Sequence, residues 1–229
     1  MKAVAFDFGN TLASSGLPLN WQNFYRDALT AVLTVTDSDI NPNKLQDGEK
    51  ILLKYNTRVN EREYEVTSDT IFNDLFQAWD IADLSMFKVA KDAFFPFFFR
   101  RTEPYPETES VLKELKSKNI RIGVLTDTAY GADKEYLTDR IPDLMRYFDV
   151  FLSSTDVGFR KPNVKGYLQL AKELKVKGEE CLFVGDEPKD VIGANKVEMI
   201  SVLVNRNNDK REYGQKYTVN SLRDILNLI

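Results

Sequence analysis

The polar residues of this chain that could do chemistry stand directly after short apolar runs. Asp7 follows the run at residues 3–6, and Asp186 comes just after the run at 181–184. Carboxylate oxygens hold a hard cation such as Mg²⁺, while a lysine and hydroxyls hold a phosphate group. The residues that together offer this chemistry are Asp7, Thr11, Thr126, Asp127, Lys161, Asp186 and Asp190.

Asp7 has two interpretations when the first residues are taken alone. A buried carboxylate costs desolvation unless a cation lies beside it, which favours a nucleophile or a metal ligand. The segment Asp-Phe-Gly-Asn-Thr could equally be a turn, because Gly and Asn are common turn formers. The choice between them depends on the rest of the chain.

The elements that would position these residues alternate between helix and strand from residue 103 onward. Apolar runs at 120–125, 150–152, 181–184 and 200–204 predict strands, and helical spacing predicts helices near 111–115, 167–174 and 222–229. With the run at 3–6, this pattern predicts an α/β fold, a Rossmann-like parallel sheet covered on both faces. The carboxyl ends of parallel strands share one edge, so the polar residues should converge there.

Residues 14–102 have a different character, because apolar and aromatic residues recur there at helical spacing. We expect an all-helical insertion at 14–102 and a discontinuous core formed by 1–13 and 103–229. The segment SSGLPL at 14–19 and the prolines at 104 and 106 predict the two linkers. The FFPFFF run at 94–99 could face a ligand or could pack the joint between the two domains.

Composition excludes several classes of function. Apolar residues make up 43% and charged residues 29% of 229 residues, which is typical of a globular protein. The net charge of −4 without a basic cluster argues against a nucleic-acid partner. No apolar run is long enough to span a membrane and no leader is visible, so we expect a cytoplasmic protein. With no histidine and one cysteine, Cys181, chemistry must use carboxylates, lysine, tyrosine and hydroxyls.

Four motifs of this chain resemble those of the haloacid dehalogenase-like hydrolase superfamily, in the same order. They are FDFGNTL at 6–12, GVLTD at 123–127, GFRKP at 158–162 and VGDEPKDVIGA at 184–194. PYPET and VLVNR at 202–206 are also similar to the family, so the resemblance covers essentially the whole chain.

The resemblance implies a Mg²⁺-dependent hydrolase of a small phosphorylated substrate, in which the helical insertion is a mobile cap. Its implied catalytic residues are Asp7, which forms an aspartyl-phosphate, with Thr126 and Lys161. The implied metal ligands are Asp7, the carbonyl of Gly9, Asp186 and Asp190. The implied substrate-binding residues are Asn10, Thr11, Thr126, Asp127 and Lys161.

The sequence departs from the family at Gly9. Phosphatases of the family carry a second aspartate at this position, as the acid for the leaving group and then the base for water. Its loss removes help that is typically worth ~10²–10⁴-fold in rate. Asp127 could be a relocated acid or base, or could cap the next turn. Glu187 could be a further metal ligand or a solvated loop residue.

Two other interpretations therefore remain beside a phosphatase. A dehalogenase or a phosphonate-cleaving enzyme would not need the second aspartate, although dehalogenases do not keep the metal-binding pair found here at Asp186 and Asp190. A non-catalytic descendant could bind a phosphorylated ligand or a protein. A cap lysine in the site would favour phosphonate cleavage through a Schiff base, and the candidates are Lys44, Lys54, Lys88 and Lys91.

Overall fold

The computed structural model describes residues 1–14 and 21–229, and its centre is a six-stranded sheet in the order β5-β4-β1-β6-β7-β8. Every neighbouring pair of strands is parallel. The strands are β1 (Ala3–Phe6), β4 (Arg121–Thr126), β5 (Val150–Ser153), β6 (Cys181–Gly185), β7 (Ile200–Val204) and β8 (Tyr217–Val219). The predicted Rossmann-like parallel sheet is confirmed.

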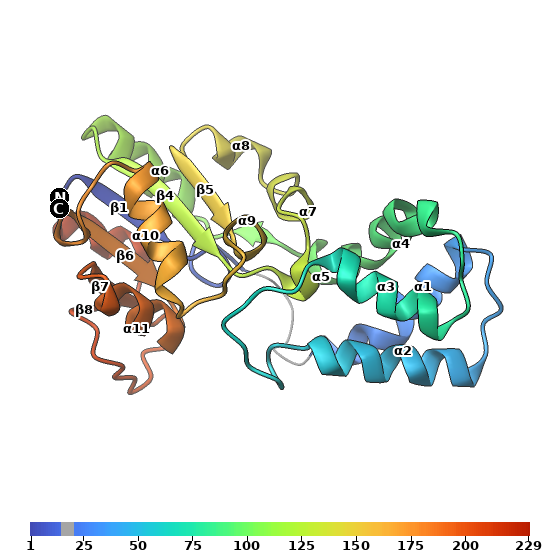
Figure 1. Ribbon diagram of the computed structural model, residues 1–229. Helices are drawn as coiled ribbons and strands as arrows, with labels where there is room; N and C mark the ends of the chain where they lie inside the picture. The colour runs from blue at the N-terminus through green and yellow to red at the C-terminus, as the bar shows by residue number, and fades with distance from the viewer. Residues whose placement is uncertain (15–20) are drawn as a thin grey trace.

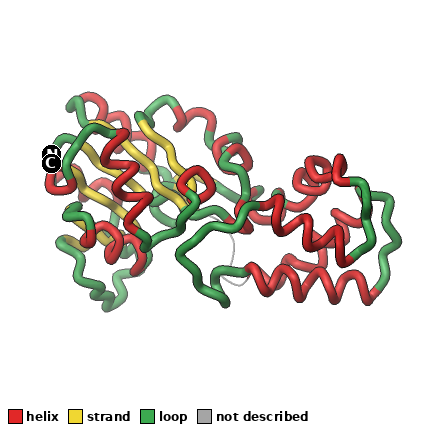
Figure 2. The backbone as a smooth tube through the Cα atoms, viewed as in Figure 1, coloured by secondary structure: helices red, strands yellow, loops and turns green. Residues whose placement is uncertain are grey.

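Helices lie on both faces of this sheet (Figures 1 and 2), and side chains that alternate along the strands pack against them. Val4 and Phe6 of β1 belong to one apolar cluster, together with residues of α6 (Thr108–Ser117) and of the 3-10 helix η5 (Leu222–Asn227). Ala3 and Ala5 belong to the opposite cluster, with residues of α10 (Val164–Glu173) and α11 (Pro188–Lys196). β1 is fully buried between the two layers.

A helical part lies beside the sheet and forms the second lobe seen in Figure 1. Its elements are η1 (Trp21–Phe24), α1 (Tyr25–Val35), α2 (Pro42–Tyr55), α3 (Ser68–Ala78), η2 (Leu84–Met86), α4 (Phe87–Phe94) and α5 (Pro96–Phe99). Asn41 caps α2 and Thr67 caps α3 through their side-chain oxygens. The apolar residues of these helices are continuous with one cluster of the sheet, so the two lobes share a core.

Two short strands connect the lobes. β2 (Ala13–Ser14) pairs antiparallel with β3 (Glu103–Pro104), and the Thr108 hydroxyl donates to the Leu12 carbonyl at 2.6 Å. Apart from Ser14, the linker expected at 14–19 lies outside the described residues. Among those residues, no helix is long and apolar enough to span a membrane.

The structure differs from the sequence-based expectation at the C-terminal end. The helix expected at 222–229 is the 3-10 helix η5, which buries Leu222 and Ile225, three residues apart. The strand β8 was not predicted, because two of its three residues are exposed and leave no apolar run. Short helical turns were also missed, namely η3 (Ala129–Gly131), α7 (Glu135–Thr138), α8 (Pro142–Met145), α9 (Ser154–Val157) and η4 (Gly178–Glu180).

Candidate active site

The loop after β1 places Asp7 at the carboxyl edge of the sheet. The Asp7 amide donates to the Val184 carbonyl at 2.8 Å, which extends the pairing of β1 with β6 past the last strand residue. The chain then turns tightly, with the Leu12 amide bonded to the Phe8 carbonyl at 2.9 Å and Asn10 in the left-handed region at φ 56°. Gly9 and Asn10 consequently line a cavity beside Asp7.

Three carboxylates meet around one buried lysine at this edge. Asp7, Asp186 and Asp190 each place an oxygen within 4.8 Å of the others. Lys161 Nζ donates to Asp7 Oδ1 at 2.5 Å and to Asp190 Oδ1 at 2.6 Å. Residues from the loop after β1, from the loop before α10, and from the loop before α11 and its first turn thus form one cluster, at the edge where the motif positions predicted that they would converge.

Local structure holds Asp186 and Asp190 in place. Asp190 lies in the first turn of α11, where its Oδ2 accepts from the Glu187 amide at 3.0 Å. Gly185 makes room for it, because a Cβ there would lie 2.4 Å from the Asp190 carboxyl group. The Thr11 hydroxyl donates to Asp186 Oδ1 at 3.3 Å. Thr11, which was expected to bind substrate, is fully buried and lines neither of the two cavities described below.

The cluster carries more negative charge than Lys161 can offset. Burial raises the pKa of Asp7 to about 6, against the opposing effect of Lys161. Burial, with Asp7 and Asp190 nearby, raises the pKa of Asp186 to about 8. A divalent cation bound by oxygen ligands would remove this repulsion, so the donor set fits such an ion.

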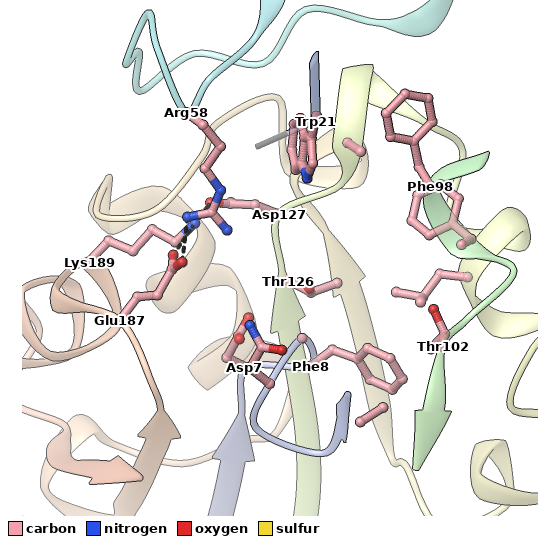
Figure 3. A pocket seen from close by; sticks show the side chains of 16 residues that line it. Asp7, Phe8, Trp21, Arg58, Phe98, Thr102, Thr126, Asp127, Glu187 and Lys189 are labelled. Carbon is pink, nitrogen blue, oxygen red and sulfur yellow. Dashed lines mark hydrogen bonds and ion pairs between the residues drawn. The ribbon is translucent and has the colours of Figure 1, made fainter. Parts of the chain in front are cut away.

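Two connected cavities open from this cluster. The first, of about 120 Å³, is lined by Asp7, Thr126 and Asp127 from the core and by Trp21, Phe98 and Phe99 from the helical part. Figure 3 shows Arg58, Glu187 and Lys189 on one side of this space and Phe98 on the other, with Trp21 between Arg58 and Phe98. The second, of about 560 Å³, shares Trp21, Arg58, Asp127, Glu187 and Lys189 with the first.

The FFPFFF run divides between its two expected roles. Phe94 and Phe95 are fully buried in the shared core, whereas Phe98 and Phe99 also line the first cavity. Pro96 begins the short helix α5, and the backbone of Phe95 before it is also helical, so Phe98 lies next to Phe94 and Phe99 next to Phe95, with ring centroids 4.9 Å and 6.1 Å apart.

A chain of ion pairs forms the charged side of the first cavity. Arg58 pairs with Glu187, whose other oxygen lies 2.9 Å from Lys189 Nζ. Lys189 Nζ also donates to Asp127 Oδ2 at 2.9 Å. Burial would raise the pKa of Asp127, but Lys189, Arg160 and Lys161 outweigh it and hold the pKa well below its usual range. Against the same effect of burial, Lys189 and Arg58 lower the pKa of Glu187 to about 2.

The helical part contacts the loop that carries Lys161. The Arg160 amide donates to the Glu63 carbonyl at 2.8 Å, and the Glu65 amide donates to the Gly158 carbonyl at 3.0 Å. The side chains of Arg160 and Glu65 form an ion pair, and both are about 95% buried or more. The Arg160 guanidinium also donates to the Thr128 carbonyl at 3.0 Å. One arginine therefore ties the helical part to two loops of the core.

Sequence reasoning missed several residues of this site. It did not single out Arg58, Glu65, Arg160 or Lys189, and it left Glu187 as either a metal ligand or a loop residue. Arg160 and Lys189 stand inside two of the recognised motifs, and a charged residue next to a predicted ligand is the signal that could have found them. Arg58 and Glu65 had no such signal, because they lie more than 90 residues from their core partners.

A family comparison agrees with this geometry. A family model described as haloacid dehalogenase-like hydrolase matches residues 1–197. The chain belongs to the haloacid dehalogenase-like hydrolase family. This hydrolase is 27% identical over 209 residues to a glyceraldehyde 3-phosphate phosphatase of Methanothermobacter thermautotrophicus, covering 90% of this chain and 86% of the relative. It is 28% identical to a phosphoglycolate phosphatase of Neisseria gonorrhoeae over 89% of this chain and 80% of the relative.

Solved structures share the fold of this hydrolase. A haloacid dehalogenase-like phosphatase from Thermococcus onnurineus aligns with a TM-score of 0.67 at 24% identity, over 100% of this chain and 97% of that one. A 2-haloacid dehalogenase from Pseudomonas syringae aligns with a TM-score of 0.70 at 21% identity, over the same shares of the two chains. At these identities the structures establish the fold alone, because both a phosphatase and a dehalogenase adopt it.

The position of Gly9 in this hydrolase can accept a side chain. A Cβ at Gly9 would have no atom within 4 Å, and its φ lies outside the left-handed region that favours glycine. The absence of a carboxylate at this residue is therefore not imposed by space or by the backbone.

The ion pairs of Asp127 give a stability prediction. We expect Asp127→Asn to lower the free energy of unfolding at neutral pH by roughly 1–3 kcal/mol, because it removes a buried partner of Lys189. Since the folded-state pKa is depressed, this contribution is present above the unfolded pKa near 3.8 and is lost as the pH falls below it. Urea denaturation at several pH values should show that the difference in free energy of unfolding between wild type and Asp127→Asn becomes smaller in acid.

Asp139→Asn is the matched control, because Asp139 is exposed and lies outside both cavities. Its effect should stay within about 0.5 kcal/mol. Equal stability of Asp127→Asn and wild type at neutral pH would contradict the role given to these ion pairs.

Proposed function

We propose that this protein is a Mg²⁺-dependent phosphatase of small phosphate esters that acts through an aspartyl-phosphate at Asp7. The observation that carries the proposal is the buried cluster of Asp7, Asp186 and Asp190 around Lys161. Relatives named as phosphatases along most of this chain support it. In this proposal residues 14–102 are the cap domain over a core made of 1–13 and 103–229, and the substrate enters between them.

Asp7 would attack the phosphorus atom, and the chain's own groups would stabilise the charge that develops. Lys161 lies against Asp7 and would offset the charge shared by the carboxylate and the phosphoryl oxygens. The Thr126 hydroxyl borders the cavity and would donate to one of those oxygens. Asp7, the carbonyl of Gly9, Asp186 and Asp190 would hold Mg²⁺, which when bound neutralises phosphoryl charge. Asn10 would border the bound phosphate.

No carboxylate on the described walls of the first cavity is suited to replace the acid missing at Gly9. Asp127 and Glu187 have pKa values held below their usual range by Lys189 and its cationic neighbours, against the effect of burial. Both are therefore charged at neutral pH and hold no proton to donate. The leaving group would depart without general acid help.

The four lysines of the helical part that would favour phosphonate cleavage give that alternative no support. Lys54 pairs with Asp74, Lys88 with Asp92 and Lys91 with Asp69. None of these three, nor Lys44, lines either cavity. A Schiff base needs a lysine that faces the substrate. The dehalogenase alternative is disfavoured because the cluster around Asp7 contains both Asp186 and Asp190.

The metal gives the first test of this proposal. Mg²⁺ should raise the melting temperature of the wild type, and Asp186→Asn should abolish most of that rise along with the activity. Because the pKa of Asp186 is raised to about 8, protons compete with the ion, so the rise should be larger near pH 8.5 than near pH 6. Thermal melting with and without Mg²⁺ measures it, and an unchanged response in Asp186→Asn would place the metal elsewhere.

Gly9 gives the second test. The wild type should hydrolyse aryl phosphates, whereas alkyl phosphates, whose leaving groups need a proton, should be slower by ~10²–10⁴-fold. Gly9→Asp should speed the alkyl esters, because the new side chain has open space. Gly9→Asn is the matched control, with similar size and no proton to give, and should show no gain. Similar wild-type rates on both ester classes, with chemistry rate-limiting, would show that another residue supplies the acid.

A further inference from the structure

The first cavity has a charged side and an aromatic side, and both constrain the chemistry of the leaving group of the substrate. On the charged side, Arg58 is paired with Glu187, and Lys189 is paired with both Glu187 and Asp127. Figure 3 shows these ion pairs above and to the left of Asp7. Each described cation on this side already has a carboxylate partner. A second anionic group on the substrate would have to displace Glu187 or Asp127 from these cations, and the negative charges of the two carboxylates would repel it.

The remaining wall is aromatic, and its Trp21 borders the charged side, with the Arg58 guanidinium 5.8 Å from the centre of the ring. Phe98 stacks at 4.9 Å from Phe94 and at 5.2 Å from Tyr130, and it meets Trp21 edge-on at 6.2 Å. Phe98 is 4% exposed, so these neighbours fix its ring in the wall. Phe8, Phe99 and Leu137 also line this cavity. Such a wall favours a flat apolar group by burying its faces and edges.

The first cavity is close in size to a single apolar ring. The first cavity measures about 120 Å³. Apolar protein cavities of about 150 Å³ bind benzene. A ring and a phosphate together need more than this volume, so the substrate would extend toward the second cavity of about 560 Å³, whose lining also includes Trp21.

We infer that the substrates of this protein are aryl phosphates, whose aromatic ring lies against Trp21 and Phe98 while the phosphate lies at Asp7. The inference rests on the proposed phosphatase function and adds the class of the leaving group. The inferred leaving group is an aromatic ring that carries no second anionic group next to the ester oxygen.

The absence of a carboxylic acid at Gly9 points independently to aryl phosphates as the class of substrate. In the reaction an Asp7 oxygen forms a bond to phosphorus, the bond from phosphorus to the aryl oxygen breaks, and its electron pair stays on that oxygen. A phenol has a pKa near 10, as tyrosine does, so it leaves as a phenolate without receiving a proton. Water then attacks the phosphorus of the acylphosphate and releases inorganic phosphate and free Asp7.

Binding of inert phosphonates tests the wall without requiring turnover. With Mg²⁺ present, calorimetry should show phenylphosphonate binding at least about tenfold more tightly than ethylphosphonate or phosphonoacetate. Trp21→Leu and Phe98→Leu should each remove most of that preference and leave ethylphosphonate binding unchanged. Phe97→Leu is the matched control, because Phe97 belongs to the same run but lines neither cavity, and it should keep the preference.

The outcomes separate this inference from the proposed function. Hydrolysis of phosphate esters together with equal or tighter binding of phosphonoacetate would overturn the aryl inference and leave the phosphatase standing. A phenylphosphonate preference that persists in both wall variants would also overturn it, because the ring would then bind elsewhere. A preference lost in both variants, without hydrolysis of any ester, would support the aryl site and reject the phosphatase.

Discussion

The interaction on which the site depends is the contact of Lys161 with Asp7 and Asp190. Its ammonium group lies 2.5 Å from one carboxylate and 2.6 Å from the other, and with Asp186 nearby three acids share one cation. Removing one partner from such a buried cluster costs roughly 3–5 kcal/mol, so its members hold one another in place. The same imbalance creates a demand for a further positive charge, which a bound divalent metal ion would satisfy. Stability and chemistry therefore depend on the same few atoms.

The loop that carries Lys161 also links this cluster to the helical part. Arg160 pairs with Glu65, and the two backbones are hydrogen bonded on either side of that pair. The helical part contributes Trp21 and Phe98 to the cavity in which Asp7 lies. The position of the aromatic wall relative to Asp7 is thus coupled to the loop that carries Lys161, the cationic partner of Asp7. Gly9 and this wall together favour a leaving group that is apolar and departs without a proton.

Much of this arrangement could be predicted from the sequence, because parallel strands bring their carboxyl ends to one edge whatever the distance between them along the chain. Asp7, Lys161 and Asp190 meet for that reason. The remainder depends on pairings that no local pattern encodes. Arg58 and Glu65 lie in a loop of the helical part, and their partners follow about a hundred residues later. The FFPFFF run could not be assigned in advance, because rings four residues apart share one helical face and only tertiary packing decides that Phe98 and Phe99 reach the cavity.

The most direct test of the account is whether Asp7 carries the phosphoryl group during turnover. Rapid acid quench of the enzyme with Mg²⁺ and an aryl phosphate, followed by peptide mass spectrometry, detects such an adduct. The account predicts one phosphoryl group on the peptide that contains Asp7 in the wild type, and none in Asp7→Asn. Two results would contradict the account. One is hydrolysis of the ester in a single turnover at a rate faster than phosphorylation of Asp7. The other is a phosphoryl group on another residue.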